Sequence, residues 1–173
     1  TMMIPTAYGR KDDCLYLHGS SKNFMFSQIL NNQTTCIAVT HLDGIVLAKN
    51  LFHSSVNYRS AVLFGKAVLV EHESERIEAL KIISEHILLG RTAEVELGSD
   101  LQIKATMVIK FTIERASVKI RAGGPMGDEA INNPVWSGHI PLELKAKLPV
   151  ADEKFGVQPE LSNSVKHYIQ THQ

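Results

Sequence analysis

The sequence predicts a mainly β protein with helices, in which an antiparallel, Greek-key-like barrel carries its helices on the outside. Two observations lead to this fold class. β-type runs dominate the chain, and hairpin-like turns join most of them, whereas regular β-α-β crossovers are missing from the pattern. The length of 173 residues and the hydrophobic content of 44% suit a compact domain with an ordinary core. We therefore expect one domain over residues 1–173.

The chain opens on a β-type run without a preceding turn or cap. This run, residues 1–9, and a second one at 14–19 flank the polar patch 10–13, which is typical of a hairpin. The apolar spacing from Phe24 to Leu30 then predicts a helix that ends near Asn31–Asn32, with the serines before it as N-caps.

Later elements follow from β-branched runs and from helical apolar stripes. The expected strands are 34–40 and 45–47 around a turn at Asp43–Gly44, 57–70 with a bulge or bend at Gly65, and 108–113 and 118–120 on either side of Glu114–Arg115. The expected helices are 74–88, with acidic residues in its first turn and Gly90 at its end, 98–105 and 161–172. Residues 122–127 are predicted to form a loop, and 135–144 an extended segment.

Composition excludes several classes of function. Eighteen basic residues balance eighteen acidic ones, so the chain lacks the broad positive charge of proteins that bind many phosphates of nucleic acid or membrane. Its apolar runs are far shorter than the roughly 20 residues of a membrane-spanning helix. The eight histidines have no metal-ligand spacing, and no nucleophile elbow, Walker A loop or Gly-x-Gly-x-x-Gly motif occurs. Two cysteines without a redox spacing favour a reduced, cytoplasmic protein.

Three segments are candidates for binding chemistry. His18 to Asn23 leads from a strand through a glycine turn into a helix, an arrangement that suits a terminal phosphate, although an ordinary capped helix fits as well. Tyr58 and Ser60 share a strand face that suits the edge of a heteroaromatic ring, although plain alternation with Arg59 on the surface explains the same pattern. Trp136 serves equally well as core filler or as the wall of a planar cofactor.

Four segments, in order along the chain, resemble the pyridoxamine 5′-phosphate oxidase-like flavoproteins, and within them the branch of nitroimidazole-resistance and flavin-nucleotide-binding proteins. The segments are Ile4-Pro5-Thr6-Ala7-Tyr8, Leu15-Tyr16-Leu17-His18-Gly19-Ser20, Asn57 to Gly65, and Val135-Trp136-Ser137-Gly138-His139-Ile140-Pro141. The resemblance implies an FMN-binding split β-barrel and a homodimer with FMN at the interface. It also implies that an N-terminal helix and a first barrel strand precede Thr1.

The resemblance assigns cofactor-binding roles segment by segment. Pro5 and Thr6 are expected to line the flavin along a strand. The ribityl phosphate is expected to be surrounded by His18, Gly19, Ser20, Ser21, Lys22 and Asn23, with Lys22 as its counter-charge. Asn23 stands where the family often has a second basic residue, which makes Arg59 or Arg10 the candidate second cation. Tyr58, Arg59 and Ser60 are expected near the isoalloxazine or its ribityl chain, and Trp136 beside the ring.

The resemblance implies an FMN-dependent oxidoreductase that acts on a small planar or nitroaromatic compound, with electrons from a reduced nicotinamide or another flavin carrier. His18 is the candidate proton donor, or else a hydrogen-bonding partner of the cofactor. The alternatives are a flavin store or sensor without turnover, and haem binding on the same barrel. Oxidation of pyridoxamine phosphate is disfavoured because His139 stands where the family has an arginine shortly after the tryptophan. No metal is expected.

Overall fold

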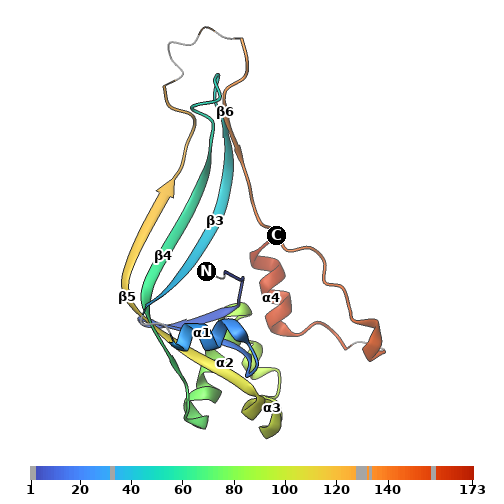
Figure 1. Ribbon diagram of the computed structural model, residues 1–173. Helices are drawn as coiled ribbons and strands as arrows, with labels where there is room; N and C mark the ends of the chain where they lie inside the picture. Colours follow the sequence, from blue (N-terminus) through green and yellow to red (C-terminus); the bar gives the residue numbers. More distant parts are fainter. Residues whose placement is uncertain (1–2, 32–33, 128–131, 133, 157–158) are drawn as a thin grey trace. The chain divides into compact units, whose positions relative to one another are not determined.

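The computed structural model describes residues 3–31, 34–127, 132, 134–156 and 159–173. Within them, six strands form one sheet in the order β1-β2-β5-β4-β3-β6 (Figure 1). The strands are β1 (Tyr8–Lys11), β2 (Cys14–Ser20), β3 (Thr35–Leu47), β4 (Ser55–Leu69), β5 (Thr106–Arg121) and β6 (Gly138–Pro141). The helices are α1 (Phe24–Asn31), α2 (Glu73–Ile87), α3 (Asp100–Ala105) and α4 (Asn163–Thr171), with short 3-10 turns η1 (Arg91–Ala93) and η2 (Glu153–Phe155). The prediction of a mainly β fold with helices is confirmed.

The chain divides into two compact units, and each is described by itself. Unit 1 comprises Thr1–Thr35, Gly65–Glu114 and Lys145–Gln173, and unit 2 comprises Cys36–Phe64 and Arg115–Leu144.

The first hairpin of unit 1 forms as predicted. β1 and β2 pair antiparallel, from Tyr8 opposite Leu17 to Lys11 opposite Cys14. Asp12 closes the turn with a φ of 54°, a left-handed conformation that aspartate tolerates better than most residues. The first strand begins only at Tyr8, however, so the expectation of a strand from residue 1 is wrong for residues 3–7, while residues 1 and 2 lie outside the described part.

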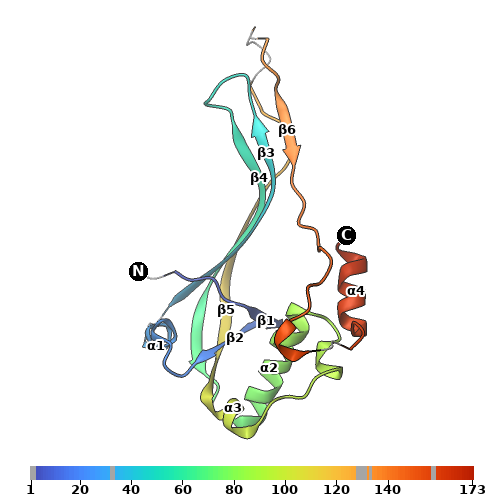
Figure 2. The ribbon, with the colours of Figure 1, turned by 90° about the vertical axis from the view of Figure 1, so that its right-hand side faces the viewer.

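The core of unit 1 lies on both faces of β2 and of the first half of β5. On one face, Tyr16 and Val108 pack with Ala79 and Ile83, which lie on the buried stripe of α2. This helix lies against β1 and β2 (Figure 2). Alternate residues of the same strands, among them Leu15, Leu17, Ile109 and Phe111, are buried on the opposite face. The ends of α2 agree with the prediction to one residue, and Ile83 of the predicted apolar stripe lies on its packed side, whereas Ile87 of that stripe is 55% exposed.

Unit 2 contains β3, most of β4, the second half of β5, and β6. The predicted turn at Asp43–Gly44 is wrong, because β3 continues through both residues. Gly44 lies opposite Pro141 of β6, and a Cβ on it would come within 2.9 Å of the Ile140 carbonyl oxygen. The glycine therefore permits a close strand contact, and the chain turns instead at 48–54, where the Ser54 hydroxyl accepts a hydrogen bond from the Ala48 amide.

The predicted interruption at Glu114–Arg115 is also wrong, since β5 runs unbroken through them. Both residues are exposed, so a strand can carry their charges at no desolvation cost. In unit 1, Glu114 pairs with Lys66 at 3.7 Å, and in unit 2 the Arg115 guanidinium lies 5.5 Å from the centre of the Phe64 ring. Each residue thus has a partner on β4.

Two further helices begin and end close to their predicted bounds. Ser99 caps α3 through a capping box with Gln102. The N-terminus of α4 is held by a residue distant in sequence, Glu94, whose carboxylate accepts hydrogen bonds from the Ser164 amide, at 2.8 Å, and from the Ser164 hydroxyl. The end of α1 agrees with the prediction as far as Asn31, and Asn32 lies outside the described residues.

Candidate functional site

The segment from Ser20 to Asn23 forms a tight turn between β2 and α1. The Asn23 amide donates to the Ser20 carbonyl at 2.9 Å, and the Lys22 amide donates to the Ser20 hydroxyl at 3.2 Å. Both bonds are local, so the turn follows from the sequence of these few residues.

The N-cap of α1 is Asn23, not a serine as predicted. Its side-chain oxygen accepts a hydrogen bond from the Phe26 amide at 3.3 Å, the usual geometry of an asparagine cap. Among the described residues, the Ser21 hydroxyl and the Lys22 ammonium group have no hydrogen-bond or ion-pair partner. The turn therefore exposes a cation and hydroxyl donors that the local structure does not use, which is the donor set that fits a phosphate.

Gly19 allows α1 to lie directly on the end of β2. A Cβ at this position would stand 3.0 Å from the Phe26 ring and 3.3 Å from the Asn23 side-chain nitrogen. Phe26 is itself fully buried. A larger residue would push α1 away from the strand and distort the turn that presents Ser20 to Lys22.

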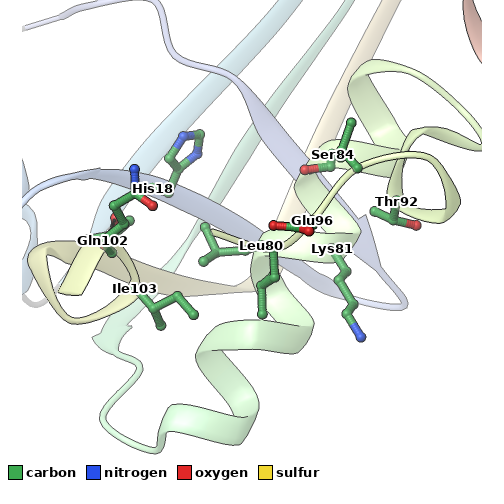
Figure 3. Close-up of a pocket in the computed structure, with 11 residues that line it drawn as sticks. His18, Leu80, Lys81, Ser84, Thr92, Glu96, Gln102 and Ile103 are labelled. Carbon is green, nitrogen blue, oxygen red and sulfur yellow. Dashed lines mark hydrogen bonds between the residues drawn. The ribbon is translucent and has the colours of Figure 1, made fainter. Parts of the chain in front are cut away.

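His18 lies at the rim of a cavity of about 290 Å³ in unit 1. The cavity is lined by one residue of β2, three of α2, one of η1, three between η1 and α3, two of α3 and one of β5: His18, Leu80, Lys81, Ser84, Thr92, Val95, Glu96, Leu97, Gln102, Ile103 and Thr106. Figure 3 shows His18 and Gln102 on one side, Ser84 and Thr92 on the other, and Glu96 between them. The candidate proton donor thus borders a space large enough for a small ligand.

Pro5 and Thr6, predicted to line the flavin along a strand, lie in the exposed segment before β1. The Thr6 hydroxyl donates to the Ala7 carbonyl at 3.2 Å, a contact within the segment itself. The structure therefore places both residues in unit 1 with the 18–23 segment, but not in a strand.

Tyr58, Arg59 and Ser60 belong to unit 2 and already have partners there. Arg59 binds Asp43 with two hydrogen bonds of 3.0 and 2.9 Å. These bonds from the guanidinium lower the pKa of Asp43 and raise that of Arg59. Arg59 is thus the partner of a carboxylate, which counts against its role as the second phosphate cation. The Ser60 hydroxyl lies 2.8 Å from that of Thr40, and Lys119 lies 5.9 Å from the centre of the Tyr58 ring.

Trp136 is 60% exposed, so it does not fill the core. Its indole lies over Gly138, where a Cβ would come within 2.8 Å of the ring. The exposed indole remains a flat apolar surface in unit 2, which is compatible with the predicted wall for a planar group.

Sequence reasoning missed a buried polar junction in unit 2. Asn57 is 5% exposed, accepts a hydrogen bond of 2.6 Å from Arg121, and donates one of 3.0 Å to the Gly123 carbonyl. It ties the start of β4 to the loop after β5. The residues that share the cavity with His18 were missed as well, because they are scattered over α2, η1, α3, β5 and the segment between η1 and α3, and no spacing in the chain connects them.

The chain is similar in sequence and in fold to known proteins. The family model described as pyridoxamine 5′-phosphate oxidase matches residues 1–120. No curated protein matches the chain. The sheet with its outer helices and this match together confirm the predicted split-barrel fold class.

The solved structures that resemble the chain include the following three. The FAD and haem binding protein from Mycobacterium smegmatis is 29% identical, with a TM-score of 0.87 over 95% of this chain and 82% of that chain. A flavocytochrome from Azotobacter vinelandii is 30% identical, with a TM-score of 0.84 over 98% and 78%. A protein from Bacteroides thetaiotaomicron assigned to 5-nitroimidazole antibiotic resistance shares the fold, at 24% identity and a TM-score of 0.55 over 66% of each chain.

Two features are absent from the described residues. No helix there is long and apolar enough to cross a membrane. No group of three or more histidine, cysteine, aspartate or glutamate side chains is placed to hold a metal ion.

Proposed function

The chain belongs to the pyridoxamine 5′-phosphate oxidase family, and on that premise we propose that it is a cytoplasmic, FMN-dependent oxidoreductase. The observation that carries the proposal is the turn at 20–23, whose lysine and serine donors are exposed and not used by local structure. The similarity to two flavin proteins at 29 and 30% identity supports a flavin as the ligand. Two free cysteines support a reducing compartment.

The residues of the turn suit the phosphate end of the cofactor. Lys22 would neutralise the phosphate, while the hydroxyls of Ser20 and Ser21 would donate to its oxygens. Pro5 and Thr6 would approach the ring system from unit 1. We propose that Tyr58, Ser60 and Trp136 contact it from a second subunit. A bound flavin supplies the hydride and electron chemistry, so the protein contributes position and exclusion of water.

His18 would act at the edge of this site. It is exposed, stands two residues before Ser20 on the same face of β2, and borders the cavity. An imidazole there can donate a proton to a reduced acceptor or a hydrogen bond to the cofactor. The substrate class that we propose is a small planar compound, including nitroaromatics, with a reduced nicotinamide or a second flavin protein as the electron donor.

A second copy of the chain, in a homodimer, would cover the exposed apolar side chains of unit 2. Among the described residues of this unit, Val46 is the only buried hydrophobic side chain, whereas the other buried hydrophobic residues all belong to unit 1. Leu42, Val118, Ile120 and Trp136 of unit 2 are each more than half exposed. A sheet so poorly covered is expected to pack against another surface, and a second copy provides it.

The test of this function is the absorbance spectrum of the purified chain, followed by denaturation and mass analysis of the released chromophore. A flavin spectrum that is bleached by a nicotinamide donor and restored by an added nitroaromatic at a catalytic rate supports the oxidoreductase. Bound flavin without turnover would favour a store or sensor. A chain that neither carries nor takes up flavin would refute the proposal.

A second candidate function is haem binding, favoured by two of the similar structures, a FAD and haem binding protein at 29% identity and a flavocytochrome at 30%. A Soret band in the same spectrum would support it. Its appearance together with flavin absorbance would place both groups on one chain.

A further inference from the structure

We propose that the cavity beside His18 binds the acceptor substrate and selects planar aromatic compounds that carry a protonated amine or amidine. This inference rests on the proposed function, in which His18 donates a proton to the acceptor at the edge of the flavin site. It goes beyond that proposal because it places the acceptor in a defined cavity of unit 1 and assigns the charge of its side chain.

His18 connects the cavity with the proposed cofactor site. It is exposed, lines the cavity, and lies on the same face of β2 as Tyr16, the face against which α2 packs. The turn proposed for the flavin phosphate begins two residues later, at Ser20. A molecule in the cavity therefore lies beside the residue that is proposed to act at the flavin, and this is the place that an acceptor must occupy.

The apolar part of the cavity wall suits an aromatic ring. Leu80, Val95, Leu97 and Ile103 contribute to the lining, and Val95 and Leu97 are exposed to solvent. A ring bound against them would remove this apolar surface from water, which favours binding. The volume of about 290 Å³ lies just below the roughly 300 to 1,000 Å³ of ordinary ligand sites. It therefore suits a single ring with a short side chain rather than a flavin nucleotide.

Glu96 gives the cavity its charge preference. Figure 3 shows Glu96 between His18 and Ser84, whereas the ammonium group of Lys81, which also lines the cavity, points away from them. Among the described residues, the side chains of Glu96, His18 and Ser84 have no hydrogen-bond or ion-pair partner. A carboxylate without a partner attracts a cation that can donate hydrogen bonds to it, and repels an anion. The cavity therefore favours an aromatic amine or amidine over a neutral or acidic compound of the same shape.

The probes are para-nitrobenzylamine and para-nitrobenzyl alcohol, because they share a planar nitroaromatic ring and differ in the charge of one short side chain. Isothermal titration into the purified full chain gives their affinities, and steady-state assays with a nicotinamide donor give kcat/KM. We expect wild type to bind the amine at least about tenfold more tightly than the alcohol, and kcat/KM to show the same preference.

Glu96→Gln is the variant that tests the assignment, because it keeps the size of the side chain and removes its charge. It should lower the affinity for the amine by about tenfold relative to that for the alcohol, and so remove the preference. The matched control is Glu71→Gln, at an exposed carboxylate of unit 1 outside the cavity lining, which should retain the preference.

Ser84→Leu is a second variant, which fills the cavity from α2 without touching the 20–23 turn. It should weaken the binding of both probes by at least about tenfold. Ser74→Leu, which places the same change on the exposed start of the same helix, should leave both affinities within about twofold of wild type.

Equal wild-type affinities for the two probes would overturn the inference and leave the flavin function standing. So would a preference for the amine that Glu96→Gln retains, or undiminished binding of both probes by Ser84→Leu. A wild type that takes up no flavin would refute the proposed function, whereas the titrations, which need no turnover, would still decide whether the cavity selects the amine.

Discussion

Single residues of the proposed phosphate turn have separable tasks. Asn23 caps α1, Gly19 lets Phe26 pack beneath the strand, and Ser20 closes the turn through its carbonyl and hydroxyl oxygens. Only Lys22 contributes a full charge to the turn and has no structural partner among the described residues. Its removal should therefore affect ligand binding and spare folding.

Lys22→Ala should weaken flavin binding by about 1 to 3 kcal/mol, the usual contribution of a charge-assisted hydrogen bond to phosphate. Isothermal titration of flavin into the variant measures the loss, and thermal unfolding checks that the melting temperature is unchanged. Lys22→Arg, which keeps the charge, should retain most of the affinity. Unchanged binding in Lys22→Ala would reduce residues 20–22 to an ordinary turn before a helix.

A second residue sets how closely two strands approach. At Gly65, a Cβ would stand 1.8 Å from the Thr112 carbonyl oxygen, a backbone atom of β5 that cannot move independently. Gly65→Ala should therefore destabilise the fold by at least about 2 kcal/mol through overpacking. Gly124→Ala is the control, because nothing lies within 4 Å of its Cβ position. Urea unfolding compares the two, and equal stabilities would contradict the close approach.

Among the helices, α4 depends on a carboxylate that lies 70 residues earlier in the chain. Hydrogen bonds from the hydroxyl and amide of Ser164, and then from the hydroxyl of Ser162, lower the pKa of Glu94 from 4.5 to about 2. A carboxylate whose pKa is depressed in the folded state stabilises that state above its unfolded pKa. The contact is therefore complete above about pH 4.5 and is lost as the pH falls towards 2.

We expect α4 to become more accessible to an acid-stable protease as the pH falls from about 4.5 towards 2. Glu94→Gln should show this accessibility already at neutral pH and should lose most of its pH dependence. Glu160→Gln, at an exposed carboxylate before α4, is the control and should behave as wild type. Cleavage rates of Glu94→Gln equal to those of wild type at pH 7 would show that Glu94 does not anchor the helix.

For the molecule as a whole, the uneven distribution of buried residues is the main physical feature. Unit 1 has a packed core, whereas the strands of unit 2 expose apolar side chains that water does not favour. The homodimer proposal follows from this difference. It requires the same surface of two copies to pack together, as in most symmetric dimers.

Light scattering should report a dimer for wild type and a monomer for the double variant Val118→Asp and Ile120→Asp. These two side chains are each 66% exposed and, as alternate residues of β5, share a face. The desolvation free energy of two carboxylates buried in an apolar interface would exceed the free energy that the remaining contacts between the two copies provide. Leu148→Asp, at an apolar position of unit 1 that is 82% exposed, is the control and should remain a dimer. A flavin-loaded wild-type monomer would contradict the proposed interface.

Patterns local to the chain were enough to predict the β1–β2 hairpin, the bounds of α2 and the turn that presents Lys22. In each of them the deciding contacts join residues close in sequence or follow one regular period. The segments around Pro5, His18 and Tyr58 carried the resemblance to the family and lie within residues 1–120, whose match establishes it, whereas the segment around Trp136 lies outside that match.

The remaining features of the fold and of the candidate site depend on contacts between residues that lie far apart in the sequence. Asp43–Gly44 has the composition of a turn, but β6 and Arg59 hold it in a strand. Arg59 has the charge to bind phosphate, but Asp43 already engages it. The cavity beside His18 is lined by side chains from five elements and the segment between η1 and α3, and no pattern in the sequence links these parts of the chain. Packing between segments far apart along the chain determines such contacts, because their free energy is gained only when the whole fold brings the partners together.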